Sequence, residues 1–139
     1  MAKMITKLVL DSDFDIGDDT WTEVAWSRPL VNSGGAWSSG SPKRLTVPSG
    51  VALVRVTAQI VFMPATSYSY ILINKNSSAT PLVVTMHVAD LPVYELSTGW
   101  IAVSATDYFM LSANNSTNKD LQGQNSSYGA SWFQMEYIT

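Results

Sequence analysis

Apolar and polar residues alternate in short runs along most of the chain. The clearest run is VALVRVTAQIVF, residues 51–62, in which every second side chain from Val54 to Phe62 is apolar while Arg55, Thr57 and Gln59 lie between them. Successive side chains of a strand point to opposite faces. One face of this strand would therefore be buried and the other wetter, as in an antiparallel sheet.

Similar runs recur along the chain, separated by stretches rich in Gly, Pro, Asn and Ser. Val, Ile, Thr and aromatic residues fill the runs, as strands prefer, and no stretch has an apolar stripe at helical spacing. The other predicted strands are residues 20–26, 43–47, 68–74, 81–88, 91–96, 99–104, 107–113 and 131–138. This density predicts an all-β fold, a single antiparallel β-sandwich of jelly-roll topology.

The first 19 residues have a different pattern. Six of the eleven acidic residues lie within positions 1–23, with apolar residues between them and a short strand-like patch at 4–10. This composition predicts an extended N-terminal arm, residues 1–19, ahead of a jelly-roll domain at 20–139. The apolar residues that such an arm would offer to a neighbour are Ile5, Leu8, Val9, Leu10, Phe14 and Ile16.

Composition narrows the classes of partner. The net charge is −3 and the few basic residues are scattered, which argues against nucleic acid as a partner. We also expect no membrane span and no signal peptide, since no apolar run is long enough for either. Charged residues make up only 14% of the chain, against about 25% in an average domain. A subunit that buries much of its surface against neighbours has this property.

The sequence contains no recognisable catalytic machinery. His87 is the single histidine, and no Ser stands in a nucleophile elbow. The run DSDFDIGDD starts like a calcium-binding EF-hand loop, but Ile16 replaces the required Gly and Thr22 the final Glu. No pair of carboxylates is fixed by spacing. We therefore expect no enzyme activity, no cofactor and no metal, with a weak calcium site at an assembly interface left open.

Five tryptophans are many for 139 residues. Exposed Trp and Tyr rings could form a platform on which a sugar stacks, although rings spaced within strands more often fill a core or a subunit contact. Trp37 stands apart because it lies in a Gly/Ser loop, from which it could insert into the core or into a neighbour.

Several short motifs carry a family resemblance over residues 20–138. They are TEVAW (22–26), the loop VNSGGAWSSG (31–40), SPKRLTVPSGVALVRVTAQIVF (41–62), YSYILINKN (68–76), ATDYFMLSANNSTN (105–118) and SWFQMEYI (131–138). Their order resembles the trimeric jelly rolls of the tumour necrosis factor and complement globular-head type, in the version found in structural proteins of tailed bacteriophages.

The resemblance implies a homotrimer packed around a threefold axis. The residues that it suggests for the trimer interface are Tyr68, Tyr70, Phe109, Trp132, Phe133 and Tyr137. Because a stalk is missing, it favours a capsid decoration (cement) protein, made in the host cytoplasm and located on the capsid surface of the virion. There the arm would bind the major capsid protein or another virion protein. The alternative is a receptor- or glycan-binding head of a phage tail fibre or spike, with a surface glycan as partner.

Overall fold

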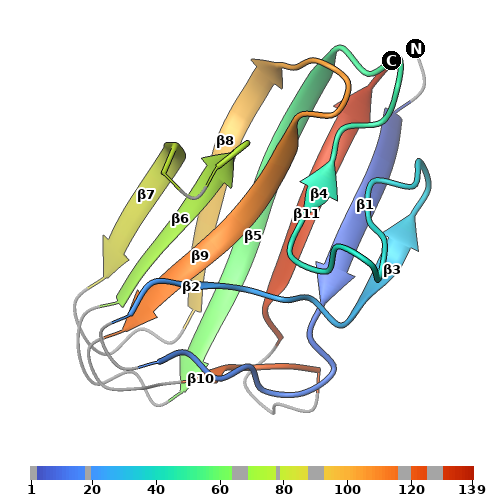
Figure 1. Ribbon diagram of the computed structural model, residues 1–139. Coiled ribbons are helices and arrows are strands. Elements are labelled where there is room, and N and C mark those ends of the chain that lie inside the picture. Colours follow the sequence, from blue (N-terminus) through green and yellow to red (C-terminus); the bar gives the residue numbers. More distant parts are fainter. Residues whose placement is uncertain are drawn as a thin grey trace.

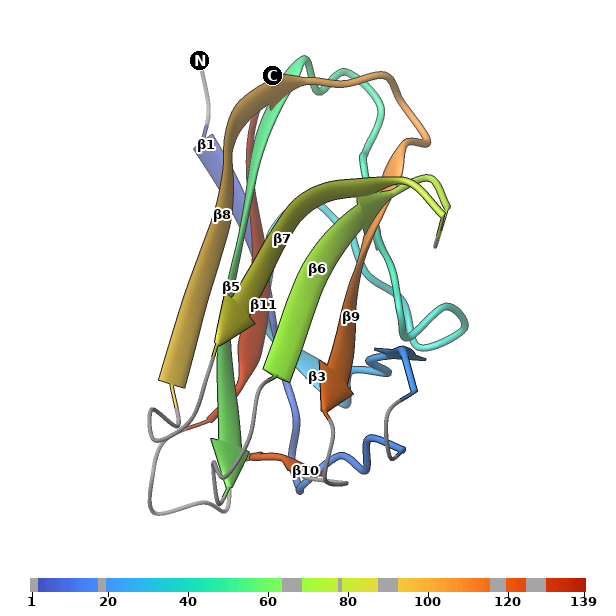
Figure 2. The ribbon, with the colours of Figure 1, turned by 90° about the vertical axis from the view of Figure 1, so that its left-hand side faces the viewer.

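The computed structural model is a sandwich of two antiparallel sheets, here called sheet A and sheet B (Figure 1). It describes residues 3–17, 20–63, 69–77, 79–87, 93–115, 120–124 and 130–139. The two sheets face each other across the core, and the chain ends lie close together at one end of the sandwich (Figure 2). The fold class that the alternation predicts, an all-β jelly-roll sandwich, is confirmed.

Sheet A follows the spatial order β8–β5–β11–β1–β3, with β10 paired to the end of β5. Its strands are β1 (Lys3–Val9), β3 (Arg28–Asn32), β5 (Leu53–Met63), β8 (Val93–Ala102), β10 (Asp120–Leu121) and β11 (Trp132–Ile138). Sheet B has the order β2–β9–β6–β7, with β4 also paired to β9. Its strands are β2 (Thr22–Glu23), β4 (Leu45–Thr46), β6 (Ser69–Lys75), β7 (Pro81–His87) and β9 (Tyr108–Asn115).

The core is the layer of side chains between the sheets. On β5 the predicted alternation holds, since Val54, Val56 and Ile60 are buried whereas Arg55 and Thr57 face outward. Around them the largest buried side chains come from both sheets and from their connections: Tyr94, Tyr137, Phe62, Phe109, Phe133, Leu8, Leu10, Ile16, Leu45, Ile60, Ile71 and Ile73. Trp26 stacks on Phe133 with ring centroids 5.7 Å apart, and Trp37 packs against the core rather than projecting from its loop.

Two predicted strands, 91–96 and 99–104, form the single strand β8. The pairing of β8 with β5 shifts register between Arg55 and Thr57, where the hydroxyl of Thr98 accepts the Val56 N–H at 3.0 Å. Gly99 follows with a φ of +69°. A β-bulge with glycine at positive φ lets one strand continue through a break in its alternation. The broken pattern predicts two strands because periodicity alone does not distinguish a bulge from a turn.

The expected N-terminal arm is wrong: these residues are part of the sandwich. β1 lies between β11 and β3, with Lys3 opposite Ile138 and Val9 opposite Trp132. Of the six proposed arm contacts, Leu8, Val9, Leu10 and Ile16 are buried, Phe14 is half-buried against the core, and Ile5 is half-buried on sheet A. Pairing satisfies the backbone of β1 on both sides, so these side chains stabilise the fold and are not available to a capsid. A domain boundary at residue 20 does not exist either.

Three polar side chains fasten β1 inside the sandwich. The Thr6 hydroxyl donates to the side-chain carbonyl of Asn32 at 3.0 Å and lies 3.2 Å from the Tyr137 hydroxyl. Gly34 lies against the Tyr137 ring so closely that a Cβ at this position would overlap it. The ends of the chain are therefore joined by a buried hydrogen-bond network, which is costly to break in a low-dielectric interior.

Half of the predicted trimer-interface residues also belong to the core. Phe109, Phe133 and Tyr137 are fully buried between the two sheets of one subunit and cannot reach another. Alternation shows which side chains of a strand share a face, but it does not show which face the second sheet covers. Trp132 does face outward from sheet A, and Tyr70 faces outward from sheet B. Tyr68 lies outside the described residues.

The position of β1 yields a stability prediction. Leu8→Ala should lower the free energy of unfolding by about 2–5 kcal/mol, because it leaves a cavity in the core. Ile5→Ala, on the outward side of the same strand, should cost about 1 kcal/mol or less in the monomer. Urea denaturation of both variants measures the difference. Equal, small losses would show that β1 is not a structural strand.

Candidate functional site

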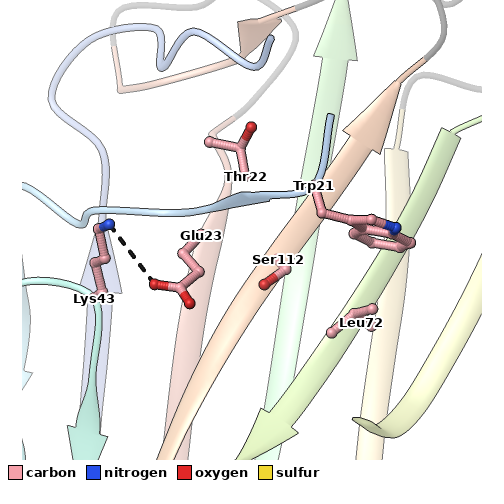
Figure 3. Close-up of a pocket in the computed structure, with 6 residues that line it drawn as sticks. All are labelled: Trp21, Thr22, Glu23, Lys43, Leu72 and Ser112. Carbon is pink, nitrogen blue, oxygen red and sulfur yellow. Dashed lines mark ion pairs between the residues drawn. The ribbon is translucent and has the colours of Figure 1, made fainter. Parts of the chain in front are cut away.

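The outward face of sheet B carries a hollow of about 540 Å³. It is lined by Trp21, Thr22, Glu23, Lys43, Leu72 and Ser112 (Figure 3). These residues come from four places in the sequence: the start of β2, the loop before β4, and strands β6 and β9. The volume lies within the range of about 300–1,000 Å³ typical of ligand sites.

Trp21 forms one wall of this hollow. Its ring projects from the start of β2 toward Leu72 of β6 (Figure 3) and packs against Tyr70 with centroids 6.1 Å apart. The side chain remains 46% exposed, whereas Val24 and Trp26, on the other face of the same segment, are buried. The predicted alternation of residues 20–26 therefore holds, and it presents one indole ring to the solvent.

Polar groups line the rest of the hollow. The Glu23 carboxylate and the Lys43 ammonium form an ion pair at 3.7 Å (Figure 3), while Thr22 and Ser112 contribute hydroxyls. Glu23 is opposite Ser112 in the pairing of β2 with β9. The two charges neutralise each other, so this hollow has an apolar wall and hydrogen-bonding groups but no net charge.

A second hollow of about 300 Å³ shares Glu23 and Lys43 with the first and extends it along β9. Here the exposed Arg44 lies over the Tyr108 ring, with its guanidinium carbon 4.0 Å from the ring centroid. Such a cation–π contact holds a flexible side chain in place. Asn76 and Ser77 complete the lining with polar groups.

The two hollows together are called the groove below. Asp107 holds Asn76 in place at its second hollow. The Ser104 N–H, the Asn76 amide and the Lys75 ammonium contact its carboxylate at 3.0, 2.8 and 2.9 Å. These partners, first the Ser104 N–H and then Asn76 and Lys75, lower the pKa of Asp107 to about 2. Asn76 has a φ of 61° and accepts the Tyr108 N–H at 2.8 Å. The Tyr108 ring is thus fixed by its backbone and by its neighbours.

The outward face of sheet A is polar at its centre. Glu136 lies there between Lys3 and Arg55, at 2.5 and 2.7 Å, and is only 7% exposed. Burial by itself raises the pKa of Glu136, but the bonds from Lys3 and Arg55 outweigh it and the pKa is lowered. Lys7 lies over the Trp132 ring at 4.6 Å. Glu136 and its two cationic neighbours thus form an ion-pair network on this face.

The groove on sheet B was only partly predictable. The sequence suggests the hypothesis that exposed aromatic rings form a platform on which a sugar stacks. It does not identify Trp21, among the five tryptophans, as the exposed ring. Glu23, Lys43 and Ser112 are not among the predicted site residues. Strand pairing brings Ser112 to Glu23 across about 90 positions, and an ion pair brings Lys43 to Glu23 from the loop before β4. The side chain of His87 lies outside the described residues.

The acidic N-terminal segment forms structural contacts. Asp11 pairs with Arg28 at 2.7 Å, and Asp13 accepts the Gly123 N–H at 3.1 Å. Burial, followed by the nearby charges of Asp15 and Asp13, raises the pKa of Asp120. Within the described ranges, no group of three or more potential ligands is placed to hold a metal ion. The same residues include no helix long and apolar enough to cross a bilayer.

Comparison with known proteins defines the class of fold. No family model and no curated protein matches the sequence. Among solved structures, murine APRIL at pH 8.0 superposes with a TM-score of 0.70 at 14% identity, over 99% of this chain and 100% of that one. The Eiger TNF of S. frugiperda has a TM-score of 0.69 at 9% identity, over 100% and 94% of the two chains. The globular domain of zebrafish complement 1qA protein has a TM-score of 0.64 at 10% identity, over 95% and 94%.

The chain therefore has the jelly-roll fold of tumour necrosis factor-like proteins and complement globular heads. At these identities the similarity defines the fold alone, and it agrees with the tumour necrosis factor and complement globular-head part of the resemblance.

The contacts of Asp107 yield a pH prediction. A depressed folded-state pKa stabilises the protein above the unfolded value of about 3.9, and this stabilisation is lost as the pH falls toward about 2. Asp107→Asn should therefore lower the free energy of unfolding by about 1–2 kcal/mol at pH 7. The gap between variant and parent should close between about pH 4 and pH 2. Urea denaturation at several pH values measures it, and a gap that does not change with pH would contradict the assignment.

Proposed function

We propose that this chain is a non-enzymatic structural protein of a tailed-bacteriophage particle that assembles as a homotrimer and decorates the capsid. The observation that carries the homotrimer is the distribution of exposed apolar residues on sheet A. The low charge content and the sequence resemblance support the virion role.

Exposed apolar side chains lie at both lateral edges of sheet A. Val93 and Trp100 on β8 are each 42% exposed, while Leu30 and Val31 on β3 are 49% and 47% exposed. These strands are at opposite ends of the sheet (Figure 1). Between them the centre of the face is polar, with Thr57, Gln134 and the Glu136 ion pairs, while the Trp132 ring lies under Lys7.

Two different apolar edges fit a cyclic assembly. In a ring each interface is heterologous, so one patch of a subunit meets a different patch of the next. If sheet A faces the threefold axis, the β8 edge of one subunit meets the β3 edge of its neighbour, and the polar centre lines the axis. Burial of such apolar surface contributes about 25 cal/mol per Å².

Variants at the two edges test the homotrimer. The parent should have a mass in solution three times the 15.2 kDa of the chain. Val93→Arg and Val31→Arg should each be monomeric, because each buries an unpaired charge in the interface. Ser39→Arg, at an exposed loop position, is the control and should remain trimeric.

Mixing the two monomeric variants makes the test specific. Each retains the edge that the other lacks, so a heterologous interface predicts a one-to-one dimer in the mixture. Sedimentation velocity distinguishes the three masses. A parent that is monomeric at all concentrations, or two variants that stay trimeric, would refute the proposed interface.

Capsid attachment needs a surface other than the N-terminal segment, since that segment lies within the fold. We expect particles lacking the protein to lose density on the capsid surface and to release DNA at lower temperature, while adsorbing to cells at an unchanged rate. Imaging, heating and adsorption assays on particles with and without the protein measure these three quantities. Unchanged capsid density would reject decoration.

A second candidate function, a receptor- or glycan-binding head of a tail fibre or spike, is favoured by one observation, the groove beside Trp21. Particles that keep capsid strength but lose adsorption would support this function over decoration.

A further inference from the structure

We propose that the groove on the outward face of sheet B binds an uncharged oligosaccharide, with Trp21 stacking on one sugar ring. The inference deepens the second candidate function. It rests on the proposed trimer only in that sheet B stays exposed when sheet A is buried.

Trp21 offers an exposed indole face on which a sugar ring could stack. Tryptophan side chains are highly buried on average, yet Trp21 remains 46% exposed, and its ring packs against Tyr70 with centroids 6.1 Å apart. The face of an aromatic ring has a partial negative charge, which attracts the C–H groups on the flat face of a sugar ring. The ring is already ordered by its packing, so binding would cost little side-chain entropy.

Polar groups lie opposite the Trp21 indole, where the hydroxyl edge of a sugar would be placed. Sugar hydroxyls both donate and accept hydrogen bonds, and the hollow offers both kinds of partner. The Glu23 carboxylate accepts, the Lys43 ammonium donates, and the Ser112 hydroxyl does either. All three lie on one side of the Trp21 ring (Figure 3). A ligand seated there could stack one face and place its hydroxyl edge against these groups.

The charges in the hollow favour an uncharged ligand. Glu23 and Lys43 already compensate each other at 3.7 Å, so the first hollow attracts neither anions nor cations strongly, and Arg44 adds one positive charge to the second hollow. An apolar protein segment would have to cover this ion pair and two hydroxyls without replacing their hydrogen bonds to water, which is unfavourable. An uncharged, hydroxyl-rich ligand replaces those bonds. These features favour a saccharide over a protein partner.

The length of the groove sets the size of the ligand. The second hollow continues from Glu23 and Lys43 toward Arg44, Asn76 and Ser77. There Arg44 covers the Tyr108 ring, so apart from the Met110 side chain this part offers mainly polar contacts. The site should therefore prefer two or more linked sugar rings, the first stacked on Trp21 and the next hydrogen-bonded, over a single monosaccharide.

The test is a printed array of neutral and acidic oligosaccharides, probed with the full-length protein and followed by titration of the best-retained neutral oligosaccharide. Trp21→Ala should weaken binding at least tenfold, and Glu23→Gln should weaken it severalfold. Leu82→Ala is the control, because it removes a comparably exposed apolar side chain from β7 of the same sheet, outside the lining of both hollows, and should bind like the parent.

The monomeric Val93→Arg variant keeps this inference separate from the proposed trimer. It should bind the same oligosaccharide with unchanged affinity per chain, whatever the outcome of the assembly experiments. Retention of no neutral oligosaccharide, retention of acidic ones only, or equal binding by parent and Trp21→Ala would overturn the inference.

Discussion

The pairing of β1 between β11 and β3 is the constraint on which the rest of the structure depends. It inserts the first strand of the chain beside the last and completes sheet A. Leu8 and Leu10 then close the core against Phe133 and the side chains of sheet B. The buried contact of Thr6 with Tyr137 fixes the strand's position. Without this strand, sheet A would lose its continuity and the sandwich would expose its interior.

The same pairing determines which faces are left for function. With sheet A complete, its outward side presents a polar centre between two apolar edges, which suits contact with further copies of the chain. Sheet B presents the Trp21 groove on the opposite side of the molecule. The surface proposed for assembly and the surface proposed for a ligand thus belong to different sheets. The ion pairs of Glu136 and Asp107 hold side chains in place on these two sheets.

Sequence reasoning predicted the strands well where alternation was strong. β5, β6, β7, β9 and β11 lie within a few residues of their predicted positions, although β9 is buried on both faces from Phe109 onward. It failed at the N-terminus, where acidic residues around Phe14 and Ile16 resemble a solvated arm but bind the backbone and side chains of distant segments, as Asp13 does with Gly123. Gly123 lies 110 positions from Asp13, beyond any local pattern.

The site was less predictable than the fold for the same reason. Alternation predicts which residues of a strand lie on the same face as Phe109, Phe133 or Tyr137. It does not predict that the second sheet covers those faces. Likewise Trp21 and Trp26 look alike in the sequence, and only the packed sandwich buries one and exposes the other. Hydroxyl-radical footprinting of the tryptophans, below and above the assembly concentration, tests the separation of the two surfaces most directly. Our account predicts that Trp100 becomes protected on assembly while Trp21 stays reactive; protection of Trp21 with Trp100 unchanged would contradict it.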